Sequence, residues 1–226
     1  MDFADRLQTV WNRIRTAELH FQRPSGTTQL LAVSKTQPAA AIATLATAGQ
    51  HSFGENYLQE SLAKMAALAA LELEWHFIGP IQTNKTRAIA ERFAWAHSVD
   101  RLKIAERLSA QRPAFLPPLN VCLQVNIDQE PAKRGCDATQ AVAIAAAIAQ
   151  LPGLRLRGLM AIPAPTADFA MQRRPFAQLR QLQAQLNATG MALDTLSMGM
   201  SDDLEAAIAE GATLVRIGSA LFGPRC

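Results

Sequence analysis

The sequence predicts a single (β/α)8 barrel of the TIM type with one extra helix at its N-terminus. A chain of 226 residues can bury one sizeable core, and barrels of this length are commonly one domain. Eight short runs rich in β-branched and aromatic residues alternate with longer segments of helical period. No internal repeat and no low-complexity linker divides the chain, so residues 1–226 are expected to form one domain. A doubly wound open sheet is the alternative.

The expected elements follow one another in regular order. An amphipathic segment, Phe3–Phe21, precedes the first strand. Strands are expected at Gln29–Lys35, His51–Gly54, Glu74–Ile78, Trp95–Val99, Leu119–Ile127, Arg155–Ala161, Thr195–Met198 and Thr213–Ile217. Helices are expected near residues 38–49, 56–71, 82–92, 101–111, 137–150, 168–189 and 202–210. A helix after nearly every strand favours the barrel over the open sheet.

Composition and charge argue against several functional classes. The net charge of +3 is spread along the chain, without a block of five basic residues, so nucleic-acid binding has little support. The 3 cysteines show no C-x-x-C spacing, which suits a reducing compartment. The longest apolar run, Ala141–Ala149, is too short to cross a bilayer, and the charged N-terminus lacks the apolar core of a secretory signal. We therefore expect a cytoplasmic protein without membrane contact.

A barrel places its chemistry at the carboxyl ends of its strands. Polar residues and glycines collect at those positions in this sequence. The strand ends carry Lys35, Gly54-Glu55-Asn56, Gly79-Pro80, Asp100-Arg101, Asn126, Met160-Ala161-Ile162, Met198-Gly199-Met200-Ser201 and Arg216-Ile217-Gly218-Ser219. A barrel that served only as a scaffold would not need this collection, so we expect a functional site there.

Lys35 is the leading candidate for covalent chemistry. It closes the apolar run that begins at Leu30, and poor solvation of an ammonium there favours the neutral amine that Schiff-base chemistry requires. The alternative is a strand-end lysine that extends its amine to water.

The last two strand ends have the pattern of a phosphate site. Ser201 or Asp202 is expected to cap a helix, and Gly218-Ser219 precede a short apolar segment whose N-terminal amides could bind phosphate. An ordinary glycine turn with a capping serine is the alternative, which the nearby Arg216 and Lys35 make less favourable.

Several multi-residue motifs together resemble one family. They are Ala32–Thr36, Phe53–Tyr57, Trp75–Gly79, Gln82-x-Asn84-Lys85, Ser98–Asp100, Leu196–Asp203 and Val215–Gly218. The chain is similar to the pyridoxal-phosphate homeostasis proteins, which resemble the N-terminal barrel of alanine racemase. The resemblance extends from the N-terminal helix to Gly223.

The resemblance implies a role for each matching residue. Lys35 would form a Schiff base with the aldehyde of pyridoxal 5′-phosphate, and Arg216 would face the pyridine nitrogen. Ser201 and the Gly218-Ser219 turn would hold the phosphate, and Asn56 would line the ring pocket. The resemblance also implies a monomer or weak dimer. No metal is expected, because the four histidines lack metal-ligand spacing, and we expect them to be hydrogen-bonded framework residues.

An arginine at the ring nitrogen favours an unprotonated pyridine, which weakens the cofactor as an electron sink. Alanine racemase takes its second base, a tyrosine, from a separate C-terminal domain. The single tyrosine here, Tyr57, is expected to pack on the barrel rim, and Glu55 is expected in an ion pair rather than as a base.

Three functions follow as hypotheses. The favoured one is a carrier that binds pyridoxal phosphate reversibly and buffers it or delivers it to apo-enzymes. A pyridoxal-phosphate-dependent amino-acid racemase of low activity is the second. The third is an isomerase or phosphate-sugar enzyme in which Lys35 attacks a carbonyl of the substrate.

Overall fold

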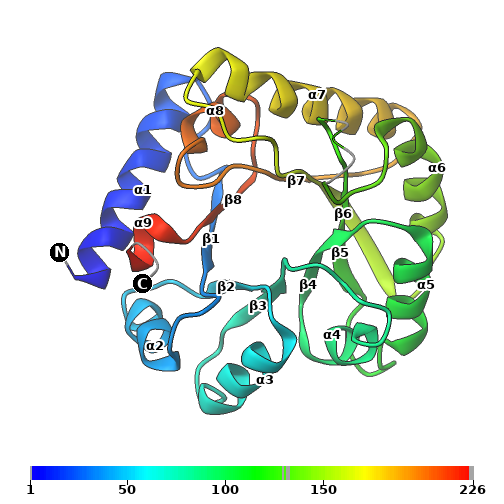
Figure 1. Cartoon of the computed structure of the whole chain (residues 1–226), viewed down its shortest axis with the longest axis horizontal. Helices are drawn as coiled ribbons and strands as arrows, with labels where there is room; N and C mark the ends of the chain where they lie inside the picture. The colour runs from blue at the N-terminus through cyan, green and yellow to red at the C-terminus, as the bar shows by residue number, and fades with distance from the viewer. Residues whose placement is uncertain (1, 129, 131–132, 224–226) are drawn as a thin grey trace.

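A computed structural model describes residues 2–128, 130 and 133–223, and Cys226 therefore lies outside the described residues. Within them, eight parallel strands close into a barrel in chain order, and each strand is followed by a helix (Figure 1). The strands are β1 (Gln29–Val33), β2 (Ser52–Glu55), β3 (Glu74–Phe77), β4 (Trp95–Val99), β5 (Leu119–Gln124), β6 (Leu154–Met160), β7 (Thr195–Ser197) and β8 (Leu214–Ile217). The helices are α1 (Phe3–His20), α2 (Ala39–Thr47), α3 (Leu58–Ala67), α4 (Thr86–Arg92), α5 (Leu102–Gln111), α6 (Ala138–Ala149), α7 (Phe169–Ala188), α8 (Leu204–Ala209) and α9 (Ser219–Phe222).

The pairing of the first and last strands closes the barrel. In β1, Ala32 lies opposite Phe53 of β2 on one side and opposite Ile217 of β8 on the other. An open doubly wound sheet would leave two edge strands, so this pairing excludes it. The prediction of a (β/α)8 barrel is confirmed.

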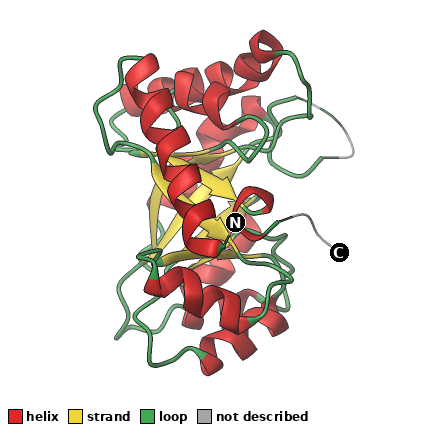
Figure 2. Ribbon diagram, turned by 90° about the vertical axis from the view of Figure 1, so that its left-hand side faces the viewer, coloured by secondary structure: helices red, strands yellow, loops and turns green. Residues whose placement is uncertain are grey.

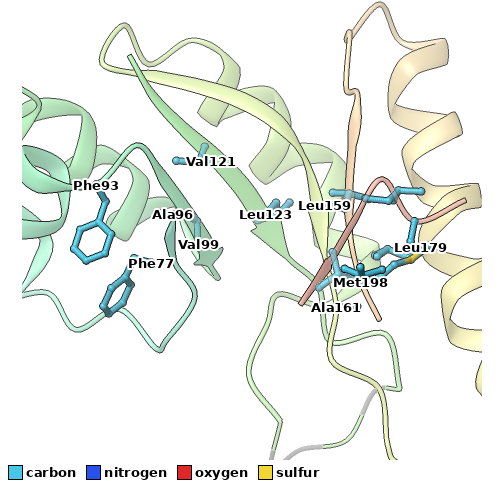
Figure 3. Packing of buried hydrophobic residues seen from close by; sticks show 14 of the residues in the cluster. Phe77, Phe93, Ala96, Val99, Val121, Leu123, Leu159, Ala161, Leu179 and Met198 are labelled. Atoms are coloured by element: carbon cyan, nitrogen blue, oxygen red, sulfur yellow. The ribbon is translucent and has the colours of Figure 1, made fainter. Parts of the chain in front are cut away.

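The main core lies between the strands and the surrounding helices. Phe77 of β3 packs edge-on against Phe93, which follows α4, with ring centroids 5.3 Å apart. Figure 3 shows further members of this layer, including Val121 and Leu159 on neighbouring strands. Each fully buried side chain of this size contributes roughly 1.5–3 kcal/mol to folding. Burial of these apolar faces therefore holds the strand ends, and the residues on them, in place.

The expected N-terminal helix is present as α1. Asp2 caps it by accepting from the Asp5 amide at 2.8 Å, and the Asp5 carboxylate accepts from the Asp2 amide at 3.3 Å. The helix packs against α2, α8 and α9 along one side of the barrel, whose strands Figure 2 shows at the centre, flanked by helices (Figures 1 and 2). Arg13 of α1 donates two hydrogen bonds, at 2.8 and 2.9 Å, to the Glu205 carboxylate of α8. This ion pair fixes α1 beside the helix that follows β7.

Most element ends differ from the expected ones by one to four residues. The helix after β7 begins at Leu204, so the expectation that Ser201 or Asp202 caps it is wrong. Asp203 is the cap residue, and its carboxylate instead accepts from the Met200 amide at 2.6 Å, which tightens the preceding turn. The short helix expected after β8 is present as α9. In the part of the chain that the structure describes, no helix is both long and apolar enough to cross a membrane.

Candidate cofactor-binding site

A cavity of about 250 Å³ opens at the carboxyl ends of the strands. It is lined by Val33, Lys35, Gln37, Asn56, Ile78, Ile162, Met200, Ser201, Asp202, Arg216, Gly218, Ser219, Phe222 and Gly223. All six residues that the sequence analysis placed in the site are among them. Segments separated by more than 180 residues in the chain therefore meet at one mouth of the barrel, as the fold predicts.

Lys35 lies in a turn just beyond β1, two residues after the strand ends at Val33. The expectation that it closes the strand itself is wrong, because the backbone turns here and Thr36 has a positive φ of 65°. Such a φ is uncommon outside glycine. The Lys35 side chain is half-buried and lines the cavity. The turn thus places Lys35 at the cavity wall.

The neighbours of Lys35 are tied to a cluster of charges between β2 and α3. The Ser34 hydroxyl donates to Glu55 Oε1 at 2.6 Å, and the Thr36 amide donates to Glu60 Oε1 at 2.6 Å. Lys64 Nζ bridges the cluster, donating to Glu55 Oε1 at 2.7 Å, to the Ser34 carbonyl at 2.7 Å and to Glu60 Oε1. The turn that carries Lys35 is therefore anchored on both sides.

Glu55 is in an ion pair, as the sequence analysis expected, and it does not line the cavity. Its side chain is fully buried, and burial raises the pKa of this carboxyl against the lowering effect of Lys64 and Ser34. Sequence reasoning missed Lys64, because nothing in the helical pattern of residues 58–67 shows that this lysine points inward.

Arg216 is a buried guanidinium at the cavity, with a relative exposure of 4%. One terminal nitrogen donates to the Ser197 carbonyl at 2.5 Å and to the Ser197 hydroxyl at 2.9 Å, and the other donates to the Ala161 carbonyl at 2.9 Å. Burial lowers the pKa of Arg216 to about 10. The side chain therefore remains positively charged at neutral pH and is held in one orientation.

Two hydroxyl groups, of Ser201 and Ser219, also line the cavity. The Ser219 hydroxyl at the start of α9 donates to Ser201 Oγ at 3.0 Å, and the Ala220 amide approaches the same oxygen at 3.4 Å. The first amides of any helix lack partners within the helix and attract anions. The hydroxyls and the start of α9 together provide donors for a bound anionic group.

Asn56 adds a polar atom to the cavity wall. Its Oδ1 is buried and has no hydrogen-bond partner among the described residues. The loop that carries it lies against Gly79, where a Cβ atom would fall 2.2 Å from the Asn56 carbonyl oxygen. Only glycine therefore allows the loop after β3 to approach so closely. A buried acceptor of this kind is suited to a donor group on a ligand.

The remaining walls are partly apolar. Ile78, Ile162 and Met200 line the cavity, and no motif identifies them as ligand contacts. Their position at strand ends is the only signal that could have found them.

Other strand-end residues lie apart from the cavity lining. Asp100 pairs with Arg101 at 2.7 Å, and the Asn126 amide donates to the Glu130 carbonyl at 2.8 Å. Tyr57 is 54% exposed and does not line the cavity either.

Comparison with known proteins identifies the family to which this chain belongs. The model of the family "Alanine racemase, N-terminal domain" matches residues 6–226. The chain is 64% identical over 222 residues to the pyridoxal phosphate homeostasis protein of Pseudomonas aeruginosa, covering 98% of this chain and 95% of that protein. It is 52% identical over 227 residues to the protein of the same name from Escherichia coli K12, covering 99% and 97%. The chain therefore belongs to the pyridoxal phosphate homeostasis proteins within the alanine racemase N-terminal domain family.

Solved structures agree with this assignment. PipY of Synechococcus elongatus PCC7942, solved with pyridoxal phosphate bound, is 41% identical with a TM-score of 0.85, covering 98% of this chain and all (100%) of that one. Alanine racemase of Clostridium difficile 630 is 15% identical with a TM-score of 0.73, covering 98% of this chain and 57% of that one. At that identity, the likeness to alanine racemase shows the fold alone.

Proposed function

We propose that this chain binds pyridoxal 5′-phosphate through Lys35 and acts in vitamin B6 homeostasis, buffering the cofactor or delivering it to apo-enzymes. The observation that carries the proposal is the convergence of an amine, a buried guanidinium and a hydroxyl-lined helix start in one cavity. Relatives named pyridoxal phosphate homeostasis proteins match nearly the whole chain, and PipY has been solved with this cofactor.

The residues present fit this cofactor. Lys35 would hold it covalently as a Schiff base, Arg216 would face the ring nitrogen, and Ser201, Gly218 and Ser219 would bind the phosphate. The orphan Oδ1 of Asn56 would accept from a polar group on the ring. When bound, the cofactor supplies an electrophilic aldehyde carbon. The attachment to an amine releases one water, and one water reverses it, so release needs no further reagent.

A carrier role is supported by what surrounds the amine. Among the described residues that line the cavity, the titratable groups are Lys35, Asp202 and Arg216. The charged Arg216 favours an unprotonated ring nitrogen and so weakens carbanion stabilisation. Lys35 would then serve as a tether. The cytoplasmic location, the single domain over residues 1–226 and the monomer or weak dimer stay predictions.

Absorbance and chemical trapping test the proposal directly. Cofactor-free protein is mixed with pyridoxal phosphate, its visible spectrum is recorded, and the adduct is reduced with borohydride and located by peptide mass spectrometry. The parent is expected to gain a visible band and carry the adduct on Lys35. Lys35→Ala should lose both, whereas Lys103→Ala, on the exposed face of α5, should keep both. A colourless parent, or an adduct on another lysine, would overturn the proposal.

The racemase alternative needs a second proton-transfer group near Lys35, and Asp202 is the candidate that the described lining offers. Chiral chromatography of L-alanine incubated with the loaded protein tests it. Turnover that is lost in both Lys35→Ala and Asp202→Asn would favour the racemase. No turnover from a fully loaded parent favours the carrier.

A further inference from the structure

A chain of hydrogen bonds crosses the interior of the barrel from the cofactor cavity to the opposite end. Arg216 Nη1 lies 2.9 Å from Ser197 Oγ, and Ser197 Oγ lies 2.8 Å from His97 Nδ1. His97 Nε2 lies 2.9 Å from His76 Nδ1, and His76 Nε2 lies 2.8 Å from Glu74 Oε1. The five residues come from strands β8, β7, β4 and β3. Four of them are at most 4% exposed.

Glu74 ends the chain of bonds at a second cavity, of about 560 Å³, at the amino-terminal ends of the strands. Its side chain is 48% exposed there, while His76 above it is buried and stacks on the Trp95 ring with centroids 5.4 Å apart. The chain of bonds therefore runs from a solvent-accessible carboxylate to the buried guanidinium at the opposite cavity.

When both histidines are neutral, one direction of the chain of bonds places a donor against the Glu74 carboxylate. Arginine has only donors, so Ser197 Oγ accepts from Arg216, and in this direction the serine proton points to His97 Nδ1. A neutral His97 that accepts at Nδ1 carries its proton on Nε2. It then donates to His76 Nδ1, which leaves the His76 proton on Nε2, facing the Glu74 carboxylate.

The charge states of the end groups agree with this direction. Burial lowers the pKa of both His76 and His97, which favours the neutral rings, and the His76 hydrogen bond lowers the pKa of Glu74. With the carboxylate ionised, the ring nitrogen of His76 beside it has to be a donor. The reverse direction would place two acceptors against each other at 2.8 Å.

We propose that Ser197, His97, His76 and Glu74 form one positioning chain that fixes the Arg216 guanidinium in the cofactor cavity from the opposite end of the barrel. Ser197 contacts Arg216 directly through its hydroxyl and its carbonyl, and the two histidines keep that hydroxyl turned to accept. The effect of the positioning chain on bound pyridoxal phosphate rests on the proposed function. The positions of the protons in cofactor-free protein do not depend on that function.

The first test is nitrogen NMR of the imidazole rings in cofactor-free protein. The parent is expected to show His76 and His97 as neutral rings with the proton on Nε2. A proton on Nδ1 of His97 would overturn the proposal, because the chain of bonds would then run in the reverse direction and leave His76 Nε2 as an acceptor facing the Glu74 carboxylate. His76→Gln and His97→Gln assign the two signals, and circular dichroism shows whether each variant is folded.

The second test measures whether a change at Glu74 affects the hydrogen bonds of Arg216. Glu74→Gln can turn a donor toward His76, and Ser197→Ala removes the hydroxyl from the middle of the chain of bonds. Both should make exchange of the Arg216 guanidinium protons about tenfold faster, because a hydrogen bond to a charged group is lost or weakened. Gln29→Ala is the matched control, because Gln29 lines the same second cavity as Glu74 but lies outside the chain of bonds. Exchange that is equal in Glu74→Gln and the parent would overturn the coupling.

The third test connects the positioning chain to the cofactor. In protein loaded with pyridoxal phosphate, Glu74→Gln is expected to shift the visible absorption band while borohydride still traps the adduct on Lys35. An unshifted band would mean that the positioning chain does not affect the bound cofactor. A parent that takes up no cofactor would overturn the proposed function, and the two NMR measurements would still decide whether the positioning chain exists.

Discussion

The two cationic residues of the cavity are supported in opposite ways. Lys35 lies in a turn anchored from the helix layer, where Lys64 joins Glu55 and Glu60 in a cluster of full charges. Arg216 is supported from the barrel interior by backbone carbonyls and by a chain of bonds through neutral side chains. Lys35 is thus supported through the residues on either side of it, whereas the Arg216 guanidinium is itself held by hydrogen bonds.

This difference matches the tasks proposed for the two residues. An amine that attaches and releases a cofactor has to change its bonding, so support through the flanking residues Ser34 and Thr36 suits Lys35. A guanidinium that faces the ring has to keep its orientation. The two supports should also fail differently, since a buried charge cluster depends on every partner, while neutral groups can lose one hydrogen bond at moderate cost.

The largest effect is expected from Lys64→Met. It leaves the Glu55 carboxylate buried without its cation, which should lower the free energy of unfolding by about 3–5 kcal/mol, measured by urea denaturation. The exposed Lys103→Met is the matched control and should change stability by less than about 0.5 kcal/mol. The double variant Lys64→Met, Glu55→Met should regain most of the loss, because it removes the stranded charge. A double variant as unstable as the single one would show that the charge cluster does not anchor the Lys35 turn electrostatically.

Arg216→Lys should cost less, about 2 kcal/mol, because the charge is retained while the forked contacts to Ser197 and Ala161 are lost. Borohydride trapping on Lys35 should persist, and the visible band of the bound cofactor should move. A variant with the parent spectrum would show that Arg216 does not face the ring, and the contrast with Lys35 would disappear.

Acid should weaken the support that Arg216 receives from the barrel interior. The pKa of His97 is lowered because the ring is buried and lies beside His76 and Arg216. Below the ordinary histidine pKa of 6.5, His97 therefore binds a proton in the unfolded chain but stays neutral in the folded protein. Stability should therefore fall as the pH falls below 6.5, by about 1.4 kcal/mol per pH unit for this residue. His97→Gln should show a shallower fall between pH 6.5 and 5.5. Parallel curves for parent and variant would mean that His97 is protonated in the fold.

How far the sequence could predict these regions depends on the range of the interactions. Strand ends marked the cavity, and Lys35, Asn56, Ser201, Arg216, Gly218 and Ser219 all line it. The histidines were expected as hydrogen-bonded framework residues, and the structure confirms this for His76 and His97. Their pairing could not be predicted, because it depends on the register between β3 and β4, in which His76 lies opposite Trp95.

Local patterns also misjudged where elements end. The run that ends in Lys35 has the composition of a strand throughout, but Ser34 and Thr36 bond to Glu55 and Glu60, and these contacts end β1 at Val33. Lys64 was overlooked for the same reason, since two of its partners, Glu55 and the Ser34 carbonyl, come from other segments. Tertiary hydrogen bonds decided these positions over local propensity.

The smallest effect is expected at Ser201, which belongs to neither support. Its contacts to Ser219 and the Ala220 amide lie at the accessible end of the cavity, so Ser201→Ala should change the free energy of unfolding by less than about 0.5 kcal/mol. The affinity for pyridoxal phosphate should nevertheless fall about tenfold, because a hydrogen bond to a charged phosphate is lost. Fluorescence titration measures this, with Ser25→Ala in an exposed loop as the control. Unchanged affinity would move the phosphate away from α9, and a large loss of stability would mean that this end of the cavity is anchored as firmly as the Lys35 turn.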